Sequence, residues 1–366
     1  MEKQSPLVLA IETSCDDTAC AILDGAGRVL SSIVASQLVH RPFGGVVPEL
    51  ASREHLRNWP EVSAAALGDA GVVLEEIDVV AATRGPGLVG ALLVGLSLGK
   101  GLAYGLGREF HGLHHMEAHL FSPFLRTGGG TAEEPPRRFT GLVVSGGHTL
   151  LLGVDRGAPG EEALRIATLA ETRDDAIGEA FDKVGKRFGL PYPQGPRVDR
   201  LAELGDAARF PLPVAARSDD LFFSYSGLKS QTLLELDRLT RRGVDTAPRP
   251  DDKDGEMTFG QEVLDLLAGF RAAAVAQLFD RLERLHRREP IELLAVSGGV
   301  AANRLLRREV GSWCEAKGVE IRLVPTAFCG DNAAMIAWRA ILNHRAGLTD
   351  DPRRCEAVSR LPFDVR

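Results

Sequence analysis

The sequence predicts an α/β protein whose two lobes enclose a cleft, and three observations support this prediction. Short apolar runs alternate with stretches of helix-forming residues along the chain. The length of 366 residues suits two domains, or one large bilobal unit, at about 150 residues per domain. Two apolar runs, at 142–144 and 294–296, each end in Ser-Gly-Gly. Backbone amides exposed at such a turn bind anions or nucleotides, so both turns are expected to face one cleft.

Composition and charge exclude several classes of protein. Hydrophobic residues make up 44% of the chain and charged residues 25%, which excludes a disordered chain and a collagen-like repeat. The formal net charge of −7 argues against a wholly basic nucleic-acid binder, although it leaves room for a basic face on one lobe. The five cysteines form no Cys-x-x-Cys pair, and their odd number does not indicate a disulfide framework.

The sequence also predicts a compartment. No run reaches the roughly 18 uninterrupted apolar residues that span a bilayer. The first four residues lead directly into an apolar strand, so no signal or transit peptide is apparent. We therefore expect a reduced, soluble, cytoplasmic protein that does not engage a membrane.

The N-terminal part of the chain predicts a strand hairpin followed by two helices that flank a third strand. The apolar runs 7–11 and 19–23 are separated by a polar turn, which is typical of a hairpin. Residues 44–59 begin with a Gly-Gly turn and continue with helix-forming residues. The strand at 79–83 leads through Arg-Gly-Pro-Gly into an apolar helix at 88–104. Four glycines in that helix predict close packing, because glycine costs about 1 kcal/mol relative to alanine unless a neighbour must approach closely.

The C-terminal half predicts the second set of elements and two loops. A helix is expected at 301–310, directly after the second Ser-Gly-Gly, then a strand at 321–324 and a helix at 332–340. Residues 127–138 carry three glycines and a Pro-Pro pair and are expected to cross between the lobes. Residues 242–256 are rich in Pro, Asp and Lys and predict an exposed insertion between helices.

The most specific local signal is a pair of histidines at helical spacing. His115 and His119 are four residues apart, so on a helix their rings share one face. Two imidazoles in that arrangement suit a Zn or Fe ion, and Asp331, which precedes the helix at 332–340, is a candidate third ligand. Two plainer interpretations stay open at this point. The histidines could lie on a surface helix, and Asp331 could be an N-cap.

The same run argues against a metalloprotease. In the protease signature His-Glu-x-x-His, the glutamate directly follows the first histidine. Here Glu117 stands two residues after His115, about 200° around a helix, where it cannot easily activate a water held between the two rings.

Nine short motifs in a fixed order make the chain recognisable. They read IETSCDDT at 11–18, GGVVPELASR at 44–53, RGPGL at 84–88, HMEAH at 115–119, VSGGHT at 144–149, DDAIGEAFDK at 174–183, FSYSGLK at 223–229, SGGVAAN at 297–303 and DNAAMIA at 331–337. With these motifs the chain resembles the tRNA threonylcarbamoyladenosine transferase family, whose catalytic subunit was once widely labelled a glycoprotease (O-sialoglycoprotein endopeptidase). The resemblance extends from about residue 8 to about residue 340.

This resemblance implies an actin-like fold of the hexokinase and actin ATPase type. Such a fold is a two-lobed α/β structure with a duplicated mixed-sheet domain around a nucleotide cleft. On this basis we expect residues 1–126 and 326–366 to form the N-terminal lobe, with a returning C-terminal helix. Residues 139–325 would form the second lobe and 127–138 the inter-lobe loop.

The resemblance also implies the site residues. It assigns one divalent metal to His115, His119 and Asp331, with Fe²⁺ expected and Zn as the alternative. The implied adenylate-binding positions lie on strand ends and turns: Val143, Val144, Ser145, Gly146, Gly147, Asp182, Gly195, Asp199 and Asn303. The chain departs from the family where Gly330 replaces a more usual Thr, Gln194 a Gly and Tyr225 a Phe.

The implied reaction moves a threonylcarbamoyl group from threonylcarbamoyl-AMP to an adenosine of tRNA, and AMP leaves. The acceptor would be the exocyclic amine of the adenosine 3′ of the anticodon, in tRNAs that read ANN codons. That amine is a weak nucleophile, so removal of its proton should help. Asp16 is the candidate base and Glu12 a second candidate. The other interpretation is that these carboxylates only hold their turn through side-chain-to-backbone hydrogen bonds.

The resemblance implies partners as well as a substrate. Besides tRNA, it predicts a paralogous non-catalytic subunit and a small ATPase if the protein is bacterial. Basic residues that could contact tRNA are Arg41, Arg53 and Arg57 in the first lobe and Lys183, Lys186 and Arg187 in the second. The competing functions are an ATPase related to sugar kinases or chaperones and a regulatory or scaffolding ATP-binding protein. An ATPase would use Mg²⁺ and would have no need of two histidines.

Overall fold

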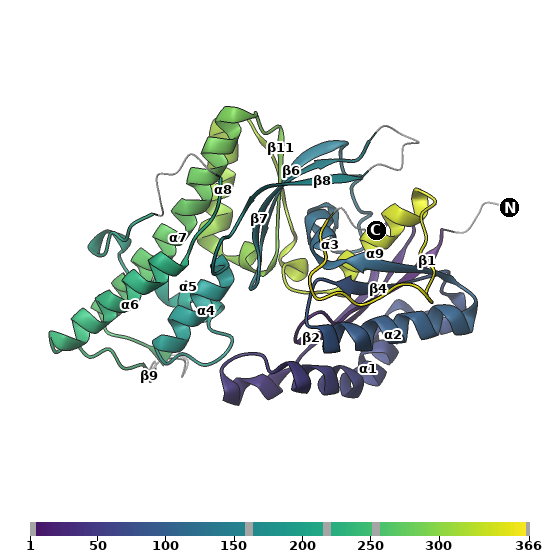
Figure 1. Ribbon diagram of the computed structural model, residues 1–366, viewed down its shortest axis with the longest axis horizontal. Coiled ribbons are helices and arrows are strands. Elements are labelled where there is room, and N and C mark those ends of the chain that lie inside the picture. The colour runs from purple at the N-terminus through teal and green to yellow at the C-terminus, as the bar shows by residue number, and fades with distance from the viewer. Residues whose placement is uncertain (1–4, 158–163, 215–220, 251–256, 364–366) are drawn as a thin grey trace.

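A computed structural model of the chain describes residues 5–157, 164–214, 221–250 and 257–363. Two five-stranded mixed sheets form the centres of two lobes that lie side by side (Figure 1). The first sheet has the order β3-β2-β1-β4-β5 and consists of Leu7–Glu12 (β1), Asp17–Asp24 (β2), Val29–Ser36 (β3), Val79–Gly85 (β4) and Glu109–His114 (β5). The second has the order β12-β11-β6-β7-β8 and consists of Arg138–Val144 (β6), Thr149–Asp155 (β7), Arg165–Glu171 (β8), Leu293–Ser297 (β11) and Glu320–Leu323 (β12).

The two sheets have the same topology. In each, three consecutive strands form an antiparallel meander, and two later strands extend the sheet in parallel from the first strand of that meander. The predicted α/β class and the duplicated mixed sheet are therefore confirmed. The chain enters the second sheet through the loop at 127–138 and returns to the first as α9 (Ala333–Arg345). The lobe boundaries expected at 126, 139 and 326 stay predictions.

Helices cover both faces of the first sheet because its strands are apolar on both sides. Leu9 and Ile11 of β1 face α1 (Pro48–Ala70) and α2 (Val89–Leu106). The alternate residues of β1 face α9, as the period of two in a strand requires. The close packing expected of α2 is confirmed, since a Cβ at Gly99 would lie 2.9 Å from the Cβ of Ala82.

Among the helices of the described residues, α2 alone is long and apolar enough to cross a membrane, judged by length and composition. Its glycine-lined face packs against β4 and α1 within the lobe. A core helix of a globular protein passes the same test, so this feature alone does not indicate a membrane span.

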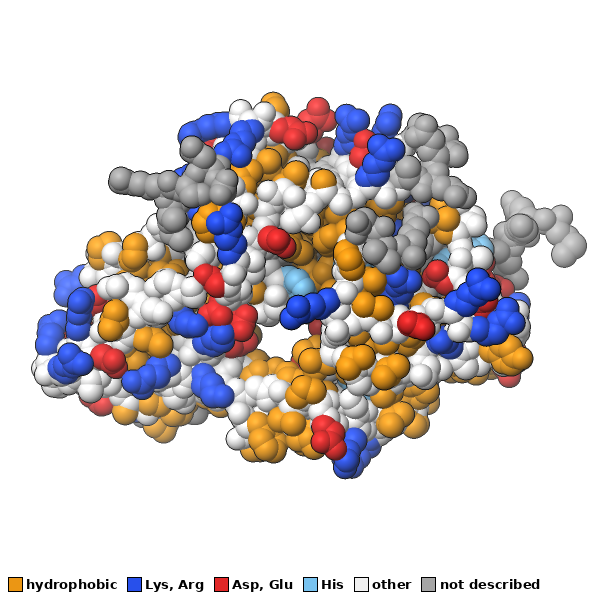
Figure 2. All heavy atoms as spheres, in the orientation of Figure 1, with side chains coloured by type: hydrophobic (Ala, Val, Ile, Leu, Met, Phe, Trp, Pro, Cys, Tyr) orange, Lys and Arg blue, Asp and Glu red, His pale blue; other side chains and the backbone are white. Residues whose placement is uncertain are grey.

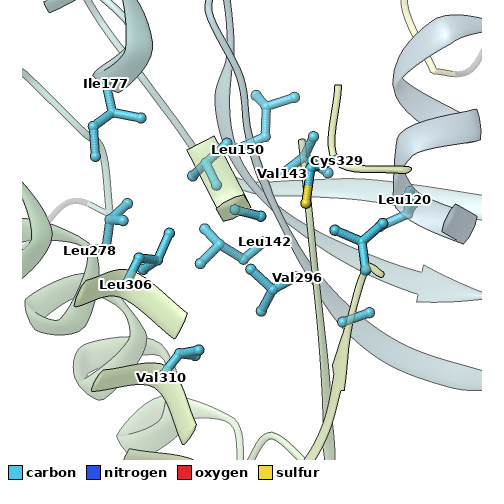
Figure 3. Close-up of a cluster of buried hydrophobic side chains, with 14 of the residues drawn as sticks. Leu120, Leu142, Val143, Leu150, Ile177, Leu278, Val296, Leu306, Val310 and Cys329 are labelled. Carbon is cyan, nitrogen blue, oxygen red and sulfur yellow. The ribbon is translucent and has the colours of Figure 1, made fainter. Parts of the chain in front are cut away.

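Five further helices cover the second sheet or lie beside it. They are α4 (Ile177–Arg187), α5 (Gly195–Ala202), α6 (Ser226–Arg241), α7 (Gln261–Arg288) and α8 (Arg304–Lys317). In Figure 3, Leu278 of α7 and Leu306 of α8 lie on one side of the strand residues Leu142 and Val296, and Leu120 of α3 (His115–Phe121) lies on the other. The short helix α3 thus packs against the second sheet although it follows β5 of the first.

Three expected helices differ in their bounds. The helix expected within 44–59 is α1, which begins at Pro48 and continues to Ala70. The helix expected at 301–310 begins later, because residues Gly299–Ala302 form a 3-10 turn and Asn303 then caps α8 by accepting the Leu306 N–H at 2.8 Å. The helix expected at 332–340 is α9 and continues to Arg345. Of the insertion expected at 242–256, residues 251–256 lie outside the described part, and its ends pair as two short strands, Arg249–Pro250 and Met257–Thr258.

Candidate functional site

A cleft of about 1650 Å³ separates the two lobes. Figure 2 shows the hollow between them, with a histidine side chain at its edge. The first lobe contributes Ser14–Asp17 after β1, Pro86–Leu88 after β4, and His115. The second lobe contributes Ser145–His148 and residues of α4 and α5. Both lobes therefore present the ends of their strands to one cleft. The two Ser-Gly-Gly turns follow adjacent parallel strands of the second sheet, β6 and β11, and residues of both turns line this cleft, as expected.

Three potential metal ligands converge at the floor of this cleft. The Nε2 atom of His119 lies 3.0 Å from Oδ1 of Asp331, and Nε2 of His115 lies 3.4 Å from the same oxygen. The ligand atoms of the three residues all lie within 4.8 Å of one another. The two rings meet edge to face, 4.7 Å apart. The fold thus brings together His119 and Asp331, which lie 212 residues apart in the sequence.

The three side chains can meet because of the positions that they occupy on α3 and before α9. His115 and His119 lie four residues apart on α3, and both are buried, so the interpretation as surface histidines is wrong. The interpretation of Asp331 as an N-cap is also wrong, because Asn332 caps α9 by accepting the Met335 N–H at 3.0 Å. Asp331 therefore keeps its carboxylate for the histidines.

Glu12 orients His115 from behind. It is fully buried, and its Oε2 lies 3.0 Å from Nδ1 of His115. The hydroxyl of Thr83 donates to the same Oε2, and the Ser14 N–H donates to Oε1. A carboxylate on one ring nitrogen fixes the other nitrogen toward the cleft, as in the carboxylate–histidine pairs of many metal sites. This buried position favours a positioning role for Glu12, and the catalytic role expected of it stays a prediction.

The charges of this cluster are strongly coupled. Burial lowers the pKa of His115, but the carboxylates of Glu12 and Asp331 outweigh this effect and raise the pKa to about 10. Burial raises the pKa of Asp331, but the two histidines hold that pKa well below its usual range. Burial keeps the pKa of His119 below its usual value. His119 is therefore a neutral imidazole, which is the form that binds a metal.

The donor set fits a divalent transition metal. Two imidazole nitrogens and one carboxylate oxygen are the ligands of many zinc and non-haem iron sites. The Nδ1 atom of His119 is buried and has no hydrogen-bond partner among the described residues. Within the described chain, Asp331 is therefore the hydrogen-bond partner of the His119 ring. Glu117 is not part of the cluster, since it pairs with Arg339 at 3.0 Å and lines a smaller pocket of about 180 Å³ behind α3.

The glycine turn of the second lobe forms the opposite wall. Ser145 closes the turn between β6 and β7 by accepting the His148 N–H at its hydroxyl. Gly178 of α4 packs directly beneath, because a Cβ there would lie 2.5 Å from the carbonyl oxygen of Ser145. Gly298 of the second Ser-Gly-Gly has φ 92°, and a Cβ there would lie 2.2 Å from the carbonyl oxygen of Val144. These contacts leave the backbone of residues 145–147 at the surface of the cleft.

Four further candidates from the sequence gather beside this turn. Oδ1 of Asp182 accepts the Gly195 N–H at 2.7 Å. Oδ1 of Asp199 accepts from the Asn303 side chain at 2.5 Å and from Arg271 at 3.1 Å. Asp182, Gly195, Asp199 and Asn303 all line the cleft. Burial raises the pKa of Asp182.

The remaining predicted residues have different positions. Val143 and Val144 are fully buried in β6, where they support the glycine turn from within the core. Asp16 lines the cleft and accepts a hydrogen bond from the Tyr192 hydroxyl at 2.9 Å, across the gap between the lobes. Lys186 makes a second bridge to the carbonyl oxygen of Gly44 at 3.3 Å.

Most cations proposed for tRNA contacts already have acidic partners. Arg53 pairs with Glu49 at 2.7 Å, and Arg187 pairs with Asp237 at 3.2 Å. Arg57 pairs with Glu54, and Lys183 pairs with Asp175 and Glu179. These pairs lower the net positive charge that the candidate cations offer to tRNA.

Sequence reasoning missed several residues of the site. Thr83 and Ser14 hold Glu12, Tyr192 reaches Asp16, and Arg271 reaches Asp199. The segment 359–363 also lines the cleft. A local signal exists only for Ser14, which lies in the first motif, because the other contacts join residues 71 to 176 positions apart.

Comparisons of the sequence with known proteins match most of the chain to one family. A sequence model of the family described as tRNA N6-adenosine threonylcarbamoyltransferase matches residues 28–338. An enzyme of that name from Sorangium cellulosum is 44% identical over 351 residues, which is 94% of this chain and 93% of that protein. One from Pelobacter propionicus is 46% identical over 334 residues, or 90% of each chain.

The solved structures show the fold. HypF from T. kodakarensis, which has an actin-like fold, matches 96% of this chain and 49% of its own length, with a TM-score of 0.58 and 14% identity. The predicted actin-like fold class is therefore confirmed.

Proposed function

The chain belongs to the tRNA N6-adenosine threonylcarbamoyltransferase family, and from this premise we propose how its cleft carries out the reaction. The protein is a transferase that moves a threonylcarbamoyl group to the N6 amine of an adenosine in tRNA. We propose that the donor is threonylcarbamoyl-AMP and that AMP is the leaving group. We further propose that the acceptor is the adenosine 3′ of the anticodon in tRNAs that read ANN codons.

The observation that carries this mechanism is the convergence of His115, His119 and Asp331 opposite the glycine turn at 145–147. These three side chains would hold one divalent ion, Fe²⁺ in our proposal and Zn as the alternative. Such an ion supplies Lewis acidity toward the oxygens of the donor. Glu12 would keep His115 oriented through the Nδ1 atom of the ring, and His115 would release its Nε2 proton to serve as a ligand.

The second lobe would bind the adenylate part of the donor. The backbone N–H groups of Ser145, Gly146 and Gly147 are suited to phosphate oxygens, since peptide amides at a turn attract anions. Asp182 and Asp199 each have a second carboxylate oxygen for ribose hydroxyls, and Asn303 holds Asp199 in place. The Gly195 N–H, at the start of α5, holds the Asp182 carboxylate in place.

Asp16 is our proposed general base. It lies in the cleft on the same turn as Ser14, so it can accept the proton that the adenosine amine loses. General base catalysis of this kind typically contributes about 10²–10⁴-fold. The Tyr192 hydroxyl, which donates to Asp16, would orient that carboxylate.

We propose that the chain works with a paralogous non-catalytic subunit and, in a bacterium, a small ATPase. Two observations support partners. Apolar side chains are exposed on neighbouring helices, with Leu56 on α1 and Val89 and Leu93 on α2, and orange side chains gather over these helices in Figure 2. The ion pairs of the candidate cations, such as Arg53 with Glu49 and Lys183 with Asp175, also leave tRNA affinity to be supplied by a partner. A cytoplasmic location remains part of this proposal.

The test uses the purified chain together with its partner proteins, threonylcarbamoyl-AMP and tRNA. Nucleoside mass spectrometry should detect the modified adenosine, and metal analysis should find about one ion per chain. ATP hydrolysis with Mg²⁺ by the chain alone, without any modified adenosine, would support the ATPase alternative, which the comparisons do not favour. Robust cleavage of a protein substrate by the chain would support the metalloprotease alternative.

A further inference from the structure

We propose that Val358–Phe363, here called the strap, positions the metal-binding helix α3 through His114. The strap follows α9 and crosses the first lobe to end at the cleft, where Ser359–Phe363 form part of its wall (Figure 1). This inference rests on the proposed metal centre, because the helix that the strap holds carries His115 and His119.

His114 joins the strap to α3 with both ring nitrogens. Its Nδ1 accepts the N–H groups of Met116 at 3.1 Å and Glu117 at 3.3 Å, so the side chain is the N-cap of α3. Its Nε2 lies 2.9 Å from the carbonyl oxygen of Leu361. Because Nδ1 accepts, the proton is on Nε2 and is donated to the strap. One neutral tautomer thus satisfies all three bonds.

The ring of His114 is also enclosed by the strap. It stacks on the ring of Phe363, with centroids 4.7 Å apart and planes 18° from parallel. Its exposed fraction is 6%, and that of Leu361 is 8%. The imidazole therefore has one face and one edge fixed by strap residues, which limits how the ring can rotate away from its cap position.

The other end of the strap is anchored on the first sheet. The Val358 N–H donates to the Arg84 carbonyl oxygen at 2.8 Å, and the Gly87 N–H donates to that of Ser359 at 3.3 Å. Gly85 is required for this approach, because a Cβ there would lie 2.1 Å from the carbonyl oxygen of Val358. The Arg-Gly-Pro-Gly motif at the end of β4 thus forms the surface against which the strap packs.

The consequence for the metal site follows from the length of α3. A helix of seven residues is not stable by itself, so its first turn depends on its cap and its packing. His115 is the first residue of that turn, directly after the cap. Loss of the strap would free the His114 ring and let the His115 imidazole move relative to His119 and Asp331. Partners that orient a ligand in this way typically change metal affinity by about 10–100-fold.

A competing role for the strap makes a different prediction. Leu361 lines both the main cleft and the smaller pocket behind α3, so the strap could serve only to separate the two. In that case its removal would change stability and substrate KM but would leave metal affinity as it is.

The experiment measures Co²⁺ affinity of the metal-free protein by visible absorption, with substrate KM and kcat recorded separately. A chain ending at Ala357 is compared with the full chain of 366 residues, and each is made with His114 and with His114→Asn. Asn can still cap α3 through its side-chain oxygen but cannot reach the strap. We expect the shorter chain to lose about tenfold in Co²⁺ affinity with His114, and less than twofold with His114→Asn.

Point variants keep the test decisive should the shorter chain fold poorly. Phe363→Ala should weaken Co²⁺ binding several-fold, His114→Ala should weaken it more than His114→Asn, and Arg360→Ala, on the exposed part of the strap, should leave it unchanged. Unchanged Co²⁺ affinity in Phe363→Ala and in the shorter chain would overturn the role of the strap. If His119→Ala also kept its Co²⁺ affinity, the proposed metal centre itself would be wrong.

Discussion

The two lobes have one strand order but bring different chemistry to the cleft between them. In the first lobe the strand ends present side chains, with Glu12 as the last residue of β1 and His115 directly after β5, both packed in a buried cluster. In the second lobe the strand ends present glycine turns, and the cleft wall at 145–147 is backbone. The same topology therefore fixes where a site lies and leaves its chemistry to the residues at the strand ends.

The difference has an energetic consequence. The cluster around His115 is buried and its charges depend on one another, so removing one group leaves others unpaired. The second-lobe residues are partly exposed to the cleft, where water can replace a lost partner. Substitutions in the first lobe should accordingly cost more than matched ones in the second.

The largest effect is expected at His119. Replacement by alanine removes one of three ligands, so metal binding should be lost and the transfer rate should fall by about 10³-fold or more. Donor binding through the second lobe should change much less. Metal analysis and calorimetry with AMP separate the two outcomes, and His286→Ala, at the far end of α7, is the matched control. Loss of AMP binding with retained metal would reverse the assignment of the lobes.

A smaller effect is expected from Glu12→Gln, which keeps the size of the side chain and removes its charge. Metal affinity should fall by about 10–100-fold, because the ring of His115 loses the group that orients it. In the metal-free protein the pKa of His115, raised to about 10 by two carboxylates, should also fall.

The sign of the accompanying stability change follows from that pKa. A raised histidine pKa stabilises the metal-free fold fully below about 6.5, and this contribution is lost as the pH rises through about 10. Glu12→Gln should shift that loss to lower pH. NMR titration of the His115 ring and thermal unfolding across pH check both points, and an unchanged His115 titration would show that Glu12 does not control it.

In the second lobe, Asp199→Ala should act on the nucleotide and not on the metal. The change removes the carboxylate that Asn303 and Arg271 share, so AMP affinity should fall by about tenfold. Co²⁺ affinity should stay within twofold of the parent protein. Calorimetry with AMP is the direct measurement, and a loss of Co²⁺ binding in this variant would mean that the two lobes do not act separately.

How far the sequence predicts this site depends on the range of the contacts. The spacing of His115 and His119 predicts one helix face, because helical geometry is local. The apolar runs predict most strands within a few residues for the same reason. Asp331 is a candidate ligand from its place before a helix, and the family resemblance assigns it to the metal, but no local pattern joins residues 212 positions apart. The strap, Tyr192 and Arg271 were not predicted at all, because each acts through a contact made only after the lobes pack.

The two asparagine caps give the finest comparison between the lobes. Asn332 caps α9 beside Asp331, and its side-chain N–H groups donate to the carbonyl oxygens of Phe328 and Gly330. Asn303 caps α8 beside the second glycine turn and donates to Asp199. Replacing either by alanine should cost about 1 kcal/mol of unfolding free energy, the usual value of an N-cap. Similar losses in thermal unfolding are therefore expected for both.

Their effects on ligands should diverge, and this divergence is the smallest effect we predict. Asn332→Ala frees the turn that carries Asp331, so it should weaken Co²⁺ binding by a few-fold and leave AMP binding unchanged. Asn303→Ala frees Asp199 and should do the reverse. Replacement by aspartate, which can cap a helix but cannot donate to a carbonyl or carboxylate, separates the two functions of each residue. If both aspartate variants regain stability and each keeps its own ligand defect, the two caps act on opposite walls of the cleft. If both variants weaken binding of the same ligand, the proposed division of metal and nucleotide binding between the lobes is wrong.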